Sequence, residues 1–339
     1  MESKVFKKNS IYIIAEIGIN HNGSLKIAKK LIKDAKLSGA NAAKFQVFEP
    51  ETLAKPKMIK TKEQKKYTDK KLSLDKMWRK VSFSEKQLKE LNLFAKKNKI
   101  DFICSVFDKI SLKKVIKIGV KCLKVASSDL NDIYLLSLIK KTNKKVILST
   151  GMSKLEEIKN ALKILGKQTI ILHCVSKYPC SPELANLKRI TQLKKILKVK
   201  VGYSDHTIGV DACKIAITLG AQVIEKHFTY NKKIKGADHV LSADKKDLKE
   251  IVNFANNYEK YLGTGQILPS RNELSYKKFF RKGLYFSQNL KKNYKLTIND
   301  IAFQRPPNSI KISKYKSLIG KKIKKDVSKF EAVNKKSFY

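Results

Sequence analysis

Short apolar runs rich in β-branched residues alternate with amphipathic stretches from residue 11 to about residue 260. Segment 84–100, "SEKQLKELNLFAKKNKI", has apolar residues at i, i+3 and i+4 and is typical of the helices expected between the runs. Eight such strands alternating with helices over roughly 250 residues predict a closed (β/α)8 barrel rather than an open doubly wound sheet. The runs expected as strands are "IYIIAEIG" (11–18), "AAKFQVF" (42–48), "DFICSVF" (101–107), "KCLKVAS" (121–127), "KVILSTG" (145–151), "TIILHCV" (169–175), "KVGYSD" (200–205) and "QVIEKHF" (222–228).

The barrel pattern is interrupted once and ends well before residue 339. The polar stretch 52–80 follows the second predicted strand and is interpreted as a loop or lid. The stretch "GTGQILPSRNELSYKKFF" (263–280) is interpreted as a linker, and residues 281–339 have short alternating runs, turns and a Pro-Pro pair. We therefore predict a barrel domain over 1–262, a linker over 263–280 and a small β-rich domain over 281–339.

Lysine dominates the charge of the chain, which carries a formal net charge of +45. A charge of this size ordinarily indicates a polyanionic partner such as nucleic acid or an anionic membrane surface. The lysines are spread through almost every predicted helix, however, and arginine, which phosphate and base recognition usually recruits, is confined to Arg79, Arg189, Arg271, Arg281 and Arg305. We therefore expect a solvated lysine surface, no nucleic-acid partner, and a field that attracts small anionic substrates.

The sequence has no signature of export, membrane insertion or a nucleotide-binding loop. The first apolar run stops at Glu16, and no stretch approaches the ~18 apolar residues of a membrane helix. Neither G-x-G-x-x-G nor G-x-x-x-x-G-K occurs. The five cysteines include no C-x-x-C pair, which argues against a disulfide framework and a zinc knuckle. We expect a cytoplasmic protein without a membrane partner.

Polar residues gather where the predicted strands end, which is where active sites of (β/α)8 barrels lie. All five histidines are among them, so a shared polar pocket is expected at this rim. The residues, in strand order, are Glu16, His21 and Asn22; Lys44 and Gln46; Ser105 and Asp108; Lys124 and Ser127; Ser149; His173, Ser176 and Tyr178; Ser204, Asp205 and His206; and Glu225, Lys226, His227, Asp238 and His239.

Lys44 and Lys124 lie inside otherwise apolar strands, and a buried ammonium group needs an anionic partner. A structural ion pair is one alternative. With the strand-end serines, a cradle for substrate phosphate and carboxylate is the favoured interpretation. His206 and His227 follow neighbouring strands; they could be hydrogen-bonded core residues, but a two-histidine site with oxygen ligands suits Mn²⁺ or Mg²⁺.

The other three histidines have less demanding interpretations. His21 and His239 are expected to orient their neighbours, and His173 is expected, with Cys174, to pack in the barrel.

Seven ordered motifs resemble those of the sialic acid synthase family over essentially the whole chain: "AEIGINHNG", "KFQ", "KVASSD", "ILSTGM", "GYSDHT", "EKHF" and "GADHVLS". The resemblance implies a (β/α)8 barrel followed by an antifreeze-protein-like (SAF) domain. It also implies condensation of phosphoenolpyruvate with an N-acetylated mannose-type sugar to a nonulosonic acid, with cleavage of the C–O bond and release of phosphate. N-acetylmannosamine and the 2,4-diacetamido-trideoxy precursor of legionaminic acid both fit.

Roles for individual residues follow from this resemblance. It implies His206 and His227 as ligands of Mn²⁺ or Mg²⁺, and a homodimer in which the SAF domain of one chain offers Arg305 to the partner's sugar. The implied catalytic residues are Glu16, Lys44, Gln46, Lys124 and Asp238, and the implied substrate-binding residues are Ser105, Ser127, Ser149, Tyr178, Ser204, Glu225 and Arg305.

Two motifs depart from the family pattern. "ICSVFD" lacks the usual Thr-Pro before Phe107, although Ser105 keeps a hydroxyl for phosphate binding. Ser128-Asp129 stands where Gly-Glu is common. The alternatives are a related synthase of the Kdo-8-phosphate or DAHP type, acting on a phosphorylated sugar, and a non-catalytic basic binding protein.

Overall fold

The computed structural model describes residues 10–53, 58–68, 73–308 and 310–339. The chain divides into two compact units, Met1–Leu262 and Gly263–Tyr339. Among the residues in these ranges, no helix is both long enough and apolar enough to cross a membrane.

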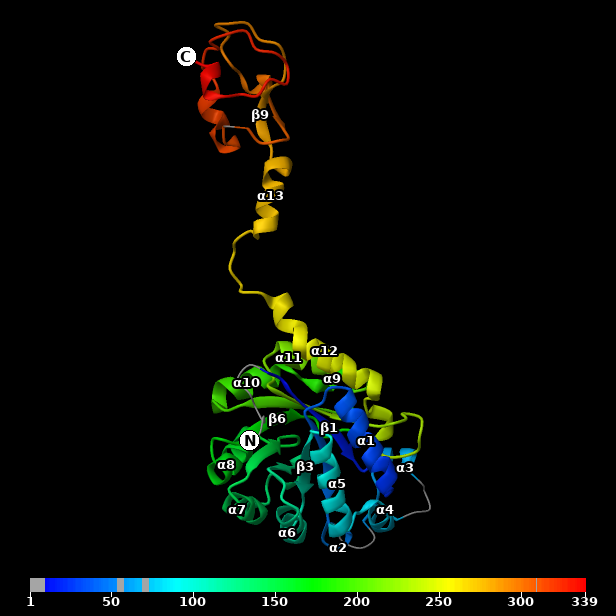
Figure 1. Ribbon diagram of the computed structural model, residues 1–339. Helices are drawn as coiled ribbons and strands as arrows, with labels where there is room; N and C mark the ends of the chain where they lie inside the picture. Colours follow the sequence, from blue (N-terminus) through cyan, green and yellow to red (C-terminus); the bar gives the residue numbers. More distant parts are fainter. Residues whose placement is uncertain (1–9, 54–57, 69–72, 309) are drawn as a thin grey trace. The chain divides into compact units, whose positions relative to one another are not determined.

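The first unit is a closed barrel of eight parallel strands in sequence order (Figure 1). The predicted (β/α)8 fold is therefore confirmed. The strands are β1 (Tyr12–Gly18), β2 (Ala42–Val47), β3 (Asp101–Val106), β4 (Cys122–Val125), β5 (Lys145–Ser149), β6 (Ile170–Cys174), β7 (Val201–Asp205) and β8 (Val223–His227).

Helices cover the outside of the barrel, and their ends carry clear capping signals. Ser84 and Gln87 form a capping box at the start of one helix, whose Leu88, Leu91 and Ala95 are buried. The helices of this unit are α1 (Leu25–Leu37), α2 (Pro50–Leu53), α3 (Lys62–Tyr67), α4 (Leu74–Val81), α5 (Glu85–Lys97), α6 (Lys109–Lys117), α7 (Ile133–Lys141), α8 (Leu155–Leu165), α9 (Pro182–Ala185), α10 (Lys188–Leu197), α11 (Asp211–Thr218) and α12 (Lys245–Leu262).

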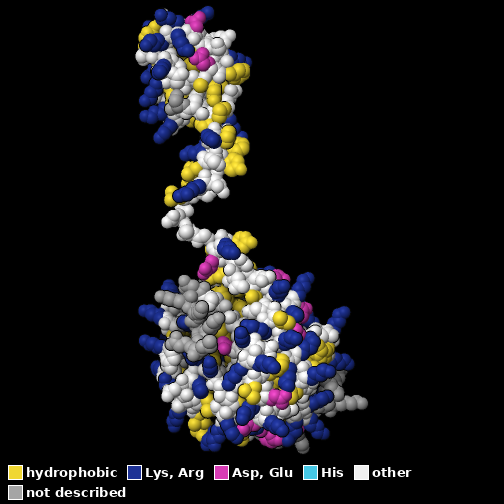
Figure 2. Space-filling view, viewed as in Figure 1, with side chains coloured by type: hydrophobic (Ala, Val, Ile, Leu, Met, Phe, Trp, Pro, Cys, Tyr) yellow, Lys and Arg dark blue, Asp and Glu magenta, His cyan; other side chains and the backbone are white. Residues whose placement is uncertain are grey.

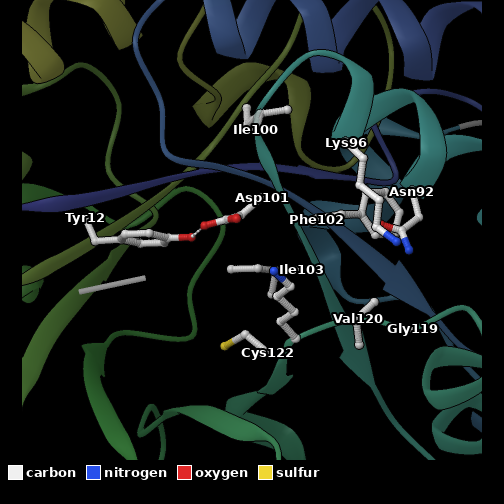
Figure 3. Close-up of a pocket in the computed structure, with 11 residues that line it drawn as sticks. Tyr12, Asn92, Lys96, Ile100, Asp101, Phe102, Ile103, Gly119, Val120 and Cys122 are labelled. Carbon is white, nitrogen blue, oxygen red and sulfur yellow. Dashed lines mark hydrogen bonds between the residues drawn. The ribbon is translucent and has the colours of Figure 1, made fainter. Parts of the chain in front are cut away.

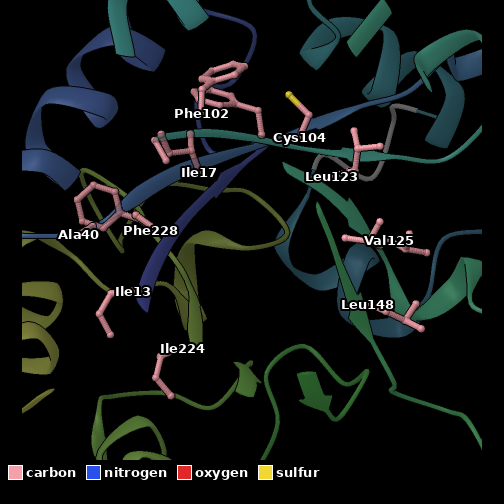
Figure 4. Packing of buried hydrophobic residues seen from close by; sticks show 14 of the residues in the cluster. Ile13, Ile17, Ala40, Phe102, Cys104, Leu123, Val125, Leu148, Ile224 and Phe228 are labelled. Atoms are coloured by element: carbon pink, nitrogen blue, oxygen red, sulfur yellow. The ribbon is translucent and has the colours of Figure 1, made fainter. Parts of the chain in front are cut away.

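Two hydrophobic layers hold the barrel together. The larger lies between strands and helices, where outward-facing residues such as Ile13, Leu123 and Ile224 pack against the helices (Figure 4). The smaller fills the barrel interior with inward-facing residues of the same strands, including Ile14, Ile103 and Leu172. Successive side chains of a strand point to opposite faces. Residues two or four positions after an inward-facing residue therefore also point inward, and the last of them lie at the carboxyl end of the barrel.

A cavity of 180 Å³ lies by the amino-terminal ends of β1, β3 and β4 (Figure 3). Tyr12 and Asp101, the first residues of β1 and β3, face one another there, and the Tyr12 hydroxyl donates a hydrogen bond to Asp101 Oδ2 at 2.6 Å. This end of the barrel is opposite to the strand ends that carry the polar residues.

The described residues of the stretch 52–80 are largely helical, so the prediction of a loop is wrong for most of them, while the alternative of a lid stays a prediction. Within it lie the end of α2, all of α3 and most of α4. Thr61 and Gln64 form a capping box, a start signal that the high lysine content of the segment obscured. Residues 54–57 and 69–72 of this stretch lie outside the described residues.

The second unit contains a small antiparallel sheet, in which β9 (Gly283–Phe286) pairs with β10 (Ile301–Gln304). Its own core is built from residues such as Leu284, Phe286 and Ile323. The segment predicted as a linker includes the helix α13 (Arg271–Phe280), which begins with a capping box of Ser270 and Glu273.

Candidate active site

Two glutamates and two lysines meet inside the barrel at the carboxyl ends of the strands. Strand alternation turns Glu16 of β1, Lys44 of β2, Lys124 of β4 and Glu225 of β8 inward, and all four are buried. Lys44 Nζ lies 2.9 Å from Glu16 Oε2 and 3.4 Å from Glu225 Oε2. Lys124 Nζ lies 3.8 Å from Glu225 Oε1. The four formal charges cancel.

Hydroxyl and amide groups complete the contacts of this cluster. Lys44 Nζ donates to Ser105 Oγ at 3.0 Å, and Lys124 Nζ donates to Ser149 Oγ at 2.7 Å. Ser204 Oγ donates to Glu225 Oε1 at 2.9 Å. Gln46 Nε2 donates to Glu16 Oε1 at 3.0 Å.

The lysines therefore already have anionic partners within the chain. The structural ion pair that the sequence left open is present, and burial of Lys44 and Lys124 does not by itself demand an external anion. Glu16 Oε2 and Glu225 Oε2 are buried and lie 2.9 Å and 3.4 Å from the Lys44 ammonium group, and neither accepts a further hydrogen bond in the part of the chain that the structure describes. Each can accept a hydrogen bond from a ligand.

The two carboxylates differ in proton affinity. Burial raises the pKa of Glu16 above its ordinary value, despite the opposing effect of Lys44. Burial alone would also raise the pKa of Glu225, but Lys124 and Lys44 together hold it below its ordinary value. A pair of carboxyl groups whose environments separate their pKa values is typical of sites where one group exchanges protons and the other stays charged.

His206 and His227 lie side by side at the ends of β7 and β8, with ring centroids 5.4 Å apart. His206 Nδ1 donates to the Val175 carbonyl at 2.8 Å, which leaves its Nε2 with a free lone pair. His227 Nδ1 is buried without a hydrogen-bond partner among the described residues and lies 3.6 Å from Asp238 Oδ2. The Tyr178 ring packs against the His206 ring, with ring centroids 4.0 Å apart.

These imidazoles fit a divalent cation, because each has one ring nitrogen for which the described residues provide no hydrogen bond. Within the described ranges, no group of three or more His, Cys, Asp and Glu is arranged to hold a metal. A cation at the two histidines would therefore need oxygen ligands from water or substrate, as Mn²⁺ and Mg²⁺ accept readily.

The expectation of one pocket shared by all five histidines is wrong. His173 points out of the barrel, where its Nε2 lies 2.7 Å from the Ala185 carbonyl and its ring stacks on Tyr203. His21 stacks on Phe83 with ring centroids 4.2 Å apart, and its Nδ1 accepts from the Gly23 amide.

His239 bonds to Thr229 Oγ1 at 2.7 Å through its Nδ1. His21, His173 and His239 are thus packed or hydrogen-bonded residues, as their less demanding interpretations predicted.

A second part of the rim is formed by the loops after β4 and β5. There Ser127 and Met152 help to line a cavity of 170 Å³. The Gly151 amide donates to Ser127 Oγ at 2.9 Å, and a β-carbon at residue 151 would lie 2.3 Å from Ser176 Oγ. A side chain at residue 151 would therefore displace the Ser176 and Ser127 hydroxyl groups. Asp129, at the end of the short 3-10 turn Ser127–Asp129, is partly buried, and desolvation raises its pKa to about 6.

Sequence reasoning missed residues that hold the rim in shape. Asn20 donates from Nδ2 to the Phe228 carbonyl at 3.0 Å and to Ser242 Oγ at 2.9 Å. Ser242 Oγ donates in turn to the Asp238 carbonyl at 2.6 Å. Nothing in the local sequence separates Asn20 from its neighbour Asn22, because its partners are more than 200 residues away.

Arg305 belongs to the second unit. Its guanidinium carbon lies 5.6 Å from the centroid of the Phe280 ring, a cation–π contact within that unit.

Lysine and arginine side chains are scattered over the visible face of the barrel unit, with acidic residues between them (Figure 2). On this face the described side chains form no elongated basic stripe of the kind that follows a nucleic-acid backbone.

Comparisons with known proteins agree in pointing to one family. The sequence model of the NeuB family matches residues 31–267. The chain is 38% identical to the N,N'-diacetyllegionaminic acid synthase of Campylobacter jejuni, over 95% of this chain and 98% of that protein. It is 34% identical to the synthase of the same name from Legionella pneumophila, over 94% of this chain and 91% of that protein. The crystal structure of N-acetylneuraminic acid synthetase from Leptospira borgpetersenii, in complex with citrate, superposes with a TM-score of 0.67 at 33% identity, covering 79% of this chain and 90% of that chain.

Proposed function

The chain belongs to the NeuB family of phosphoenolpyruvate-dependent nonulosonic acid synthases, and from that premise we propose that its sugar substrate is a 2,4-diacetamido-2,4,6-trideoxy hexose of the manno type. The product would be a diacetamido nonulosonic acid of the legionaminic type. Support comes from two relatives named as N,N'-diacetyllegionaminic acid synthases, which match along nearly their whole length. N-acetylmannosamine is the second candidate, because the Leptospira structure is named for N-acetylneuraminic acid.

The observation that carries the mechanism is the buried cluster of Glu16, Lys44, Lys124 and Glu225 beside the two histidines. We propose that the phosphate and carboxylate of phosphoenolpyruvate enter this cluster and bind Lys44 and Lys124. The strand-end hydroxyls of Ser105, Ser127, Ser149 and Ser204 would then turn from their present partners to the substrate. Charge-assisted contacts of this kind are the strong ones in a buried site.

The sugar would lie above this cluster, against Glu16, Gln46, Tyr178 and Asp238. The C3 carbon of phosphoenolpyruvate forms the new bond to the sugar aldehyde carbon, and water adds at C2. The tetrahedral intermediate then loses inorganic phosphate as the C–O bond breaks. Glu16, whose pKa is raised by burial, is proposed to accept a proton from that water as it adds, while the aldehyde oxygen takes up a proton and becomes a hydroxyl group.

A divalent ion held by His206 and His227 would supply Lewis-acid polarisation of the aldehyde oxygen. His206 is pre-oriented for such a role by its hydrogen bond to the Val175 carbonyl. Asp238, beside His227, would accept a hydrogen bond from a sugar hydroxyl at neutral pH, since burial raises the pKa of Asp238 only to about 6.

We further propose a homodimer in which Arg305 of one chain contacts the sugar in the barrel of its partner. The support is the position of Arg305 in the "FQRPPN" motif of the second unit, on the strand-to-turn segment after β10. A cytoplasmic setting is also proposed, because all five cysteines are free and buried.

The experiment that tests the sugar assignment is phosphate release from phosphoenolpyruvate in the presence of Mn²⁺ across a panel of sugars. The 2,4-diacetamido-trideoxy sugar should give the highest kcat/KM, and N-acetylmannosamine should be slower. A higher kcat/KM with erythrose 4-phosphate or arabinose 5-phosphate would contradict the proposal and favour a synthase of the DAHP or Kdo-8-phosphate type.

A further inference from the structure

An ion pair lies behind the two histidines, on the outer face of the barrel wall. Asp205 and Lys226 are the last paired residues of the β7–β8 ladder. Lys226 Nζ lies 2.7 Å from Asp205 Oδ2, and both side chains are 0% exposed. The pair points away from the substrate cluster, because Ser204 and Glu225, the preceding residues, point inward. It therefore cannot contact the substrates.

The contacts of Asp205 are complete. Its Oδ1 accepts from the Tyr203 hydroxyl at 3.0 Å and from the Thr207 amide at 2.8 Å. Its Oδ2 accepts from Lys226 and from Cys213 Sγ of α11, which lies 3.3 Å away. Lys226 also donates to the Thr207 carbonyl.

These contacts hold the residues on both sides of His206 in place. Asp205 precedes this histidine and Thr207 follows it, and both are bonded to the ammonium group of Lys226. Lys226 in turn precedes His227 in β8. The β7–β8 ladder ends at this rung, so among the described residues these two strands are not paired with each other at the histidines. His227 pairs instead with Glu16 of β1, and the His206 carbonyl accepts from the Cys180 amide at 2.8 Å.

Stability alone does not account for an ion pair at this place. Charged pairs in a protein interior gain little over well-packed apolar residues of similar volume, because both charges must be removed from water. The pair instead fixes geometry, since charge-assisted hydrogen bonds hold their partners at short, well-defined distances.

We propose that Asp205 and Lys226 are positioning residues, forming a clamp that sets the spacing and orientation of His206 and His227 for a divalent cation. This inference rests on the proposed function only in taking the two histidines as the cation ligands. Outer groups that orient metal ligands change metal affinity by about 10- to 100-fold when they are removed.

The test is Mn²⁺ affinity of the full-length apoprotein, measured by electron paramagnetic resonance of free Mn²⁺, together with urea unfolding of the same samples. Asp205→Asn leaves the Lys226 ammonium group without its carboxylate and should be strongly destabilised. The double variant Asp205→Asn/Lys226→Met removes both charges and should recover part of that stability. Its Kd for Mn²⁺ should nevertheless rise about tenfold or more, because the clamp is gone.

Two further variants make the result decisive. Asp205→Glu keeps the charge pair but lengthens one side by a methylene group, so it should fold and still bind Mn²⁺ more weakly than the wild type. Tyr12→Phe removes a buried hydrogen bond at the opposite end of the barrel and should lower stability without changing the Kd.

Wild-type Mn²⁺ affinity in both the double variant and Asp205→Glu would overturn the clamp. His206→Ala reports on the premise instead: if it binds Mn²⁺ as the wild type does, the assignment of the cation site fails, whatever the clamp variants show. Loss of binding in His206→Ala with normal binding in the clamp variants would remove the clamp and leave the cation site intact.

Discussion

Replacing Lys124 by methionine tests whether the charged cluster binds phosphoenolpyruvate or only pairs with itself. Lys124 Nζ is bonded to Ser149 Oγ at 2.7 Å and to the Val125 carbonyl at 2.9 Å, and it lies 3.8 Å from Glu225 Oε1. Methionine keeps most of the length of the side chain, being one atom shorter, but removes every one of these contacts. The cluster would change from a net charge of zero to −1, which opposes the binding of an anion.

Two magnitudes follow from this geometry. Loss of a charged hydrogen bond to the substrate costs about 1.5–3 kcal/mol, which corresponds to a roughly 10- to 150-fold rise in the KM for phosphoenolpyruvate. Breaking a buried ion pair costs ~3–5 kcal/mol of stability. We expect no more than about 3 kcal/mol here, because Glu225 keeps Lys44 at 3.4 Å and Ser204 at 2.9 Å.

The assay is phosphate release with phosphoenolpyruvate varied at saturating sugar, below the unfolding transition of the variant. Lys121→Met is the matched control, because Lys121 is exposed just before the same strand and should leave the KM unchanged. If a folded Lys124→Met protein had the wild-type KM for phosphoenolpyruvate, Lys124 would not bind this substrate and would be only a structural partner of Glu225.

Three further results are expected. Chains with Arg305→Ala and chains with His206→Ala should each be nearly inactive, and reassorting their subunits should recover activity in hybrid dimers; no recovery would mean that the arginine does not act on a partner's site. His227→Ala should abolish turnover with an unchanged melting temperature, and near-normal activity after chelation and re-addition of Mn²⁺ would contradict the cation site. Desolvation raises the pKa of Asp129 to about 6, so folding favours its protonated form. The wild type should therefore lose stability relative to Asp129→Asn as the pH rises from about 4 to about 6. The loss should be at most ~2 kcal/mol, because Asp129 is partly exposed. Urea unfolding of both proteins at pH 4 and pH 7.5 measures this loss. An equal difference in free energy of unfolding between the two proteins at both pH values would contradict it.

The barrel could be predicted from the sequence because its strands are buried on both faces. Each of the eight apolar runs contains the strand that the structure shows, within two residues at each end. Such runs are the signature of parallel sheets covered by helices. The helix α3 was missed because its sequence, KEQKKY, has almost no apolar residues to show helical spacing. The helix α4 could have been predicted, since Leu74, Met77, Trp78 and Val81 stand at i, i+3, i+4 and i+7.

The candidate site could be predicted in outline, but the contacts that its side chains make with one another could not. The rule that barrel chemistry lies at the carboxyl ends of strands brings together Glu16, Lys44, Lys124 and Glu225. Their mutual contacts depend on the side-chain distances across the closed barrel, because Lys124 and Glu225 lie on strands that are not neighbours. The sequence contains no such information without the register.

His173 was expected to pack in the barrel, and strand alternation gives the physical reason why it does. Leu172 and Cys174 flank it in β6, and Leu172 belongs to the inner layer of the barrel. Two-residue alternation therefore turns His173 outward, away from the other polar residues. The Asp205–Lys226 pair gives the same lesson, since both charges fall on the outward face of strands whose inward face carries the chemistry.

The most direct test of the account uses phosphoenolpyruvate labelled with ¹⁸O at the bridging position, together with the 2,4-diacetamido-trideoxy sugar and Mn²⁺. Mass spectrometry of both products follows the label and the carbon skeleton in one measurement. Cleavage of the C–O bond predicts that the ¹⁸O appears in the released phosphate. One unlabelled acid with a nine-carbon skeleton should form for each molecule of phosphate. Label retained in the organic product, or phosphate released without a nine-carbon acid, would contradict it.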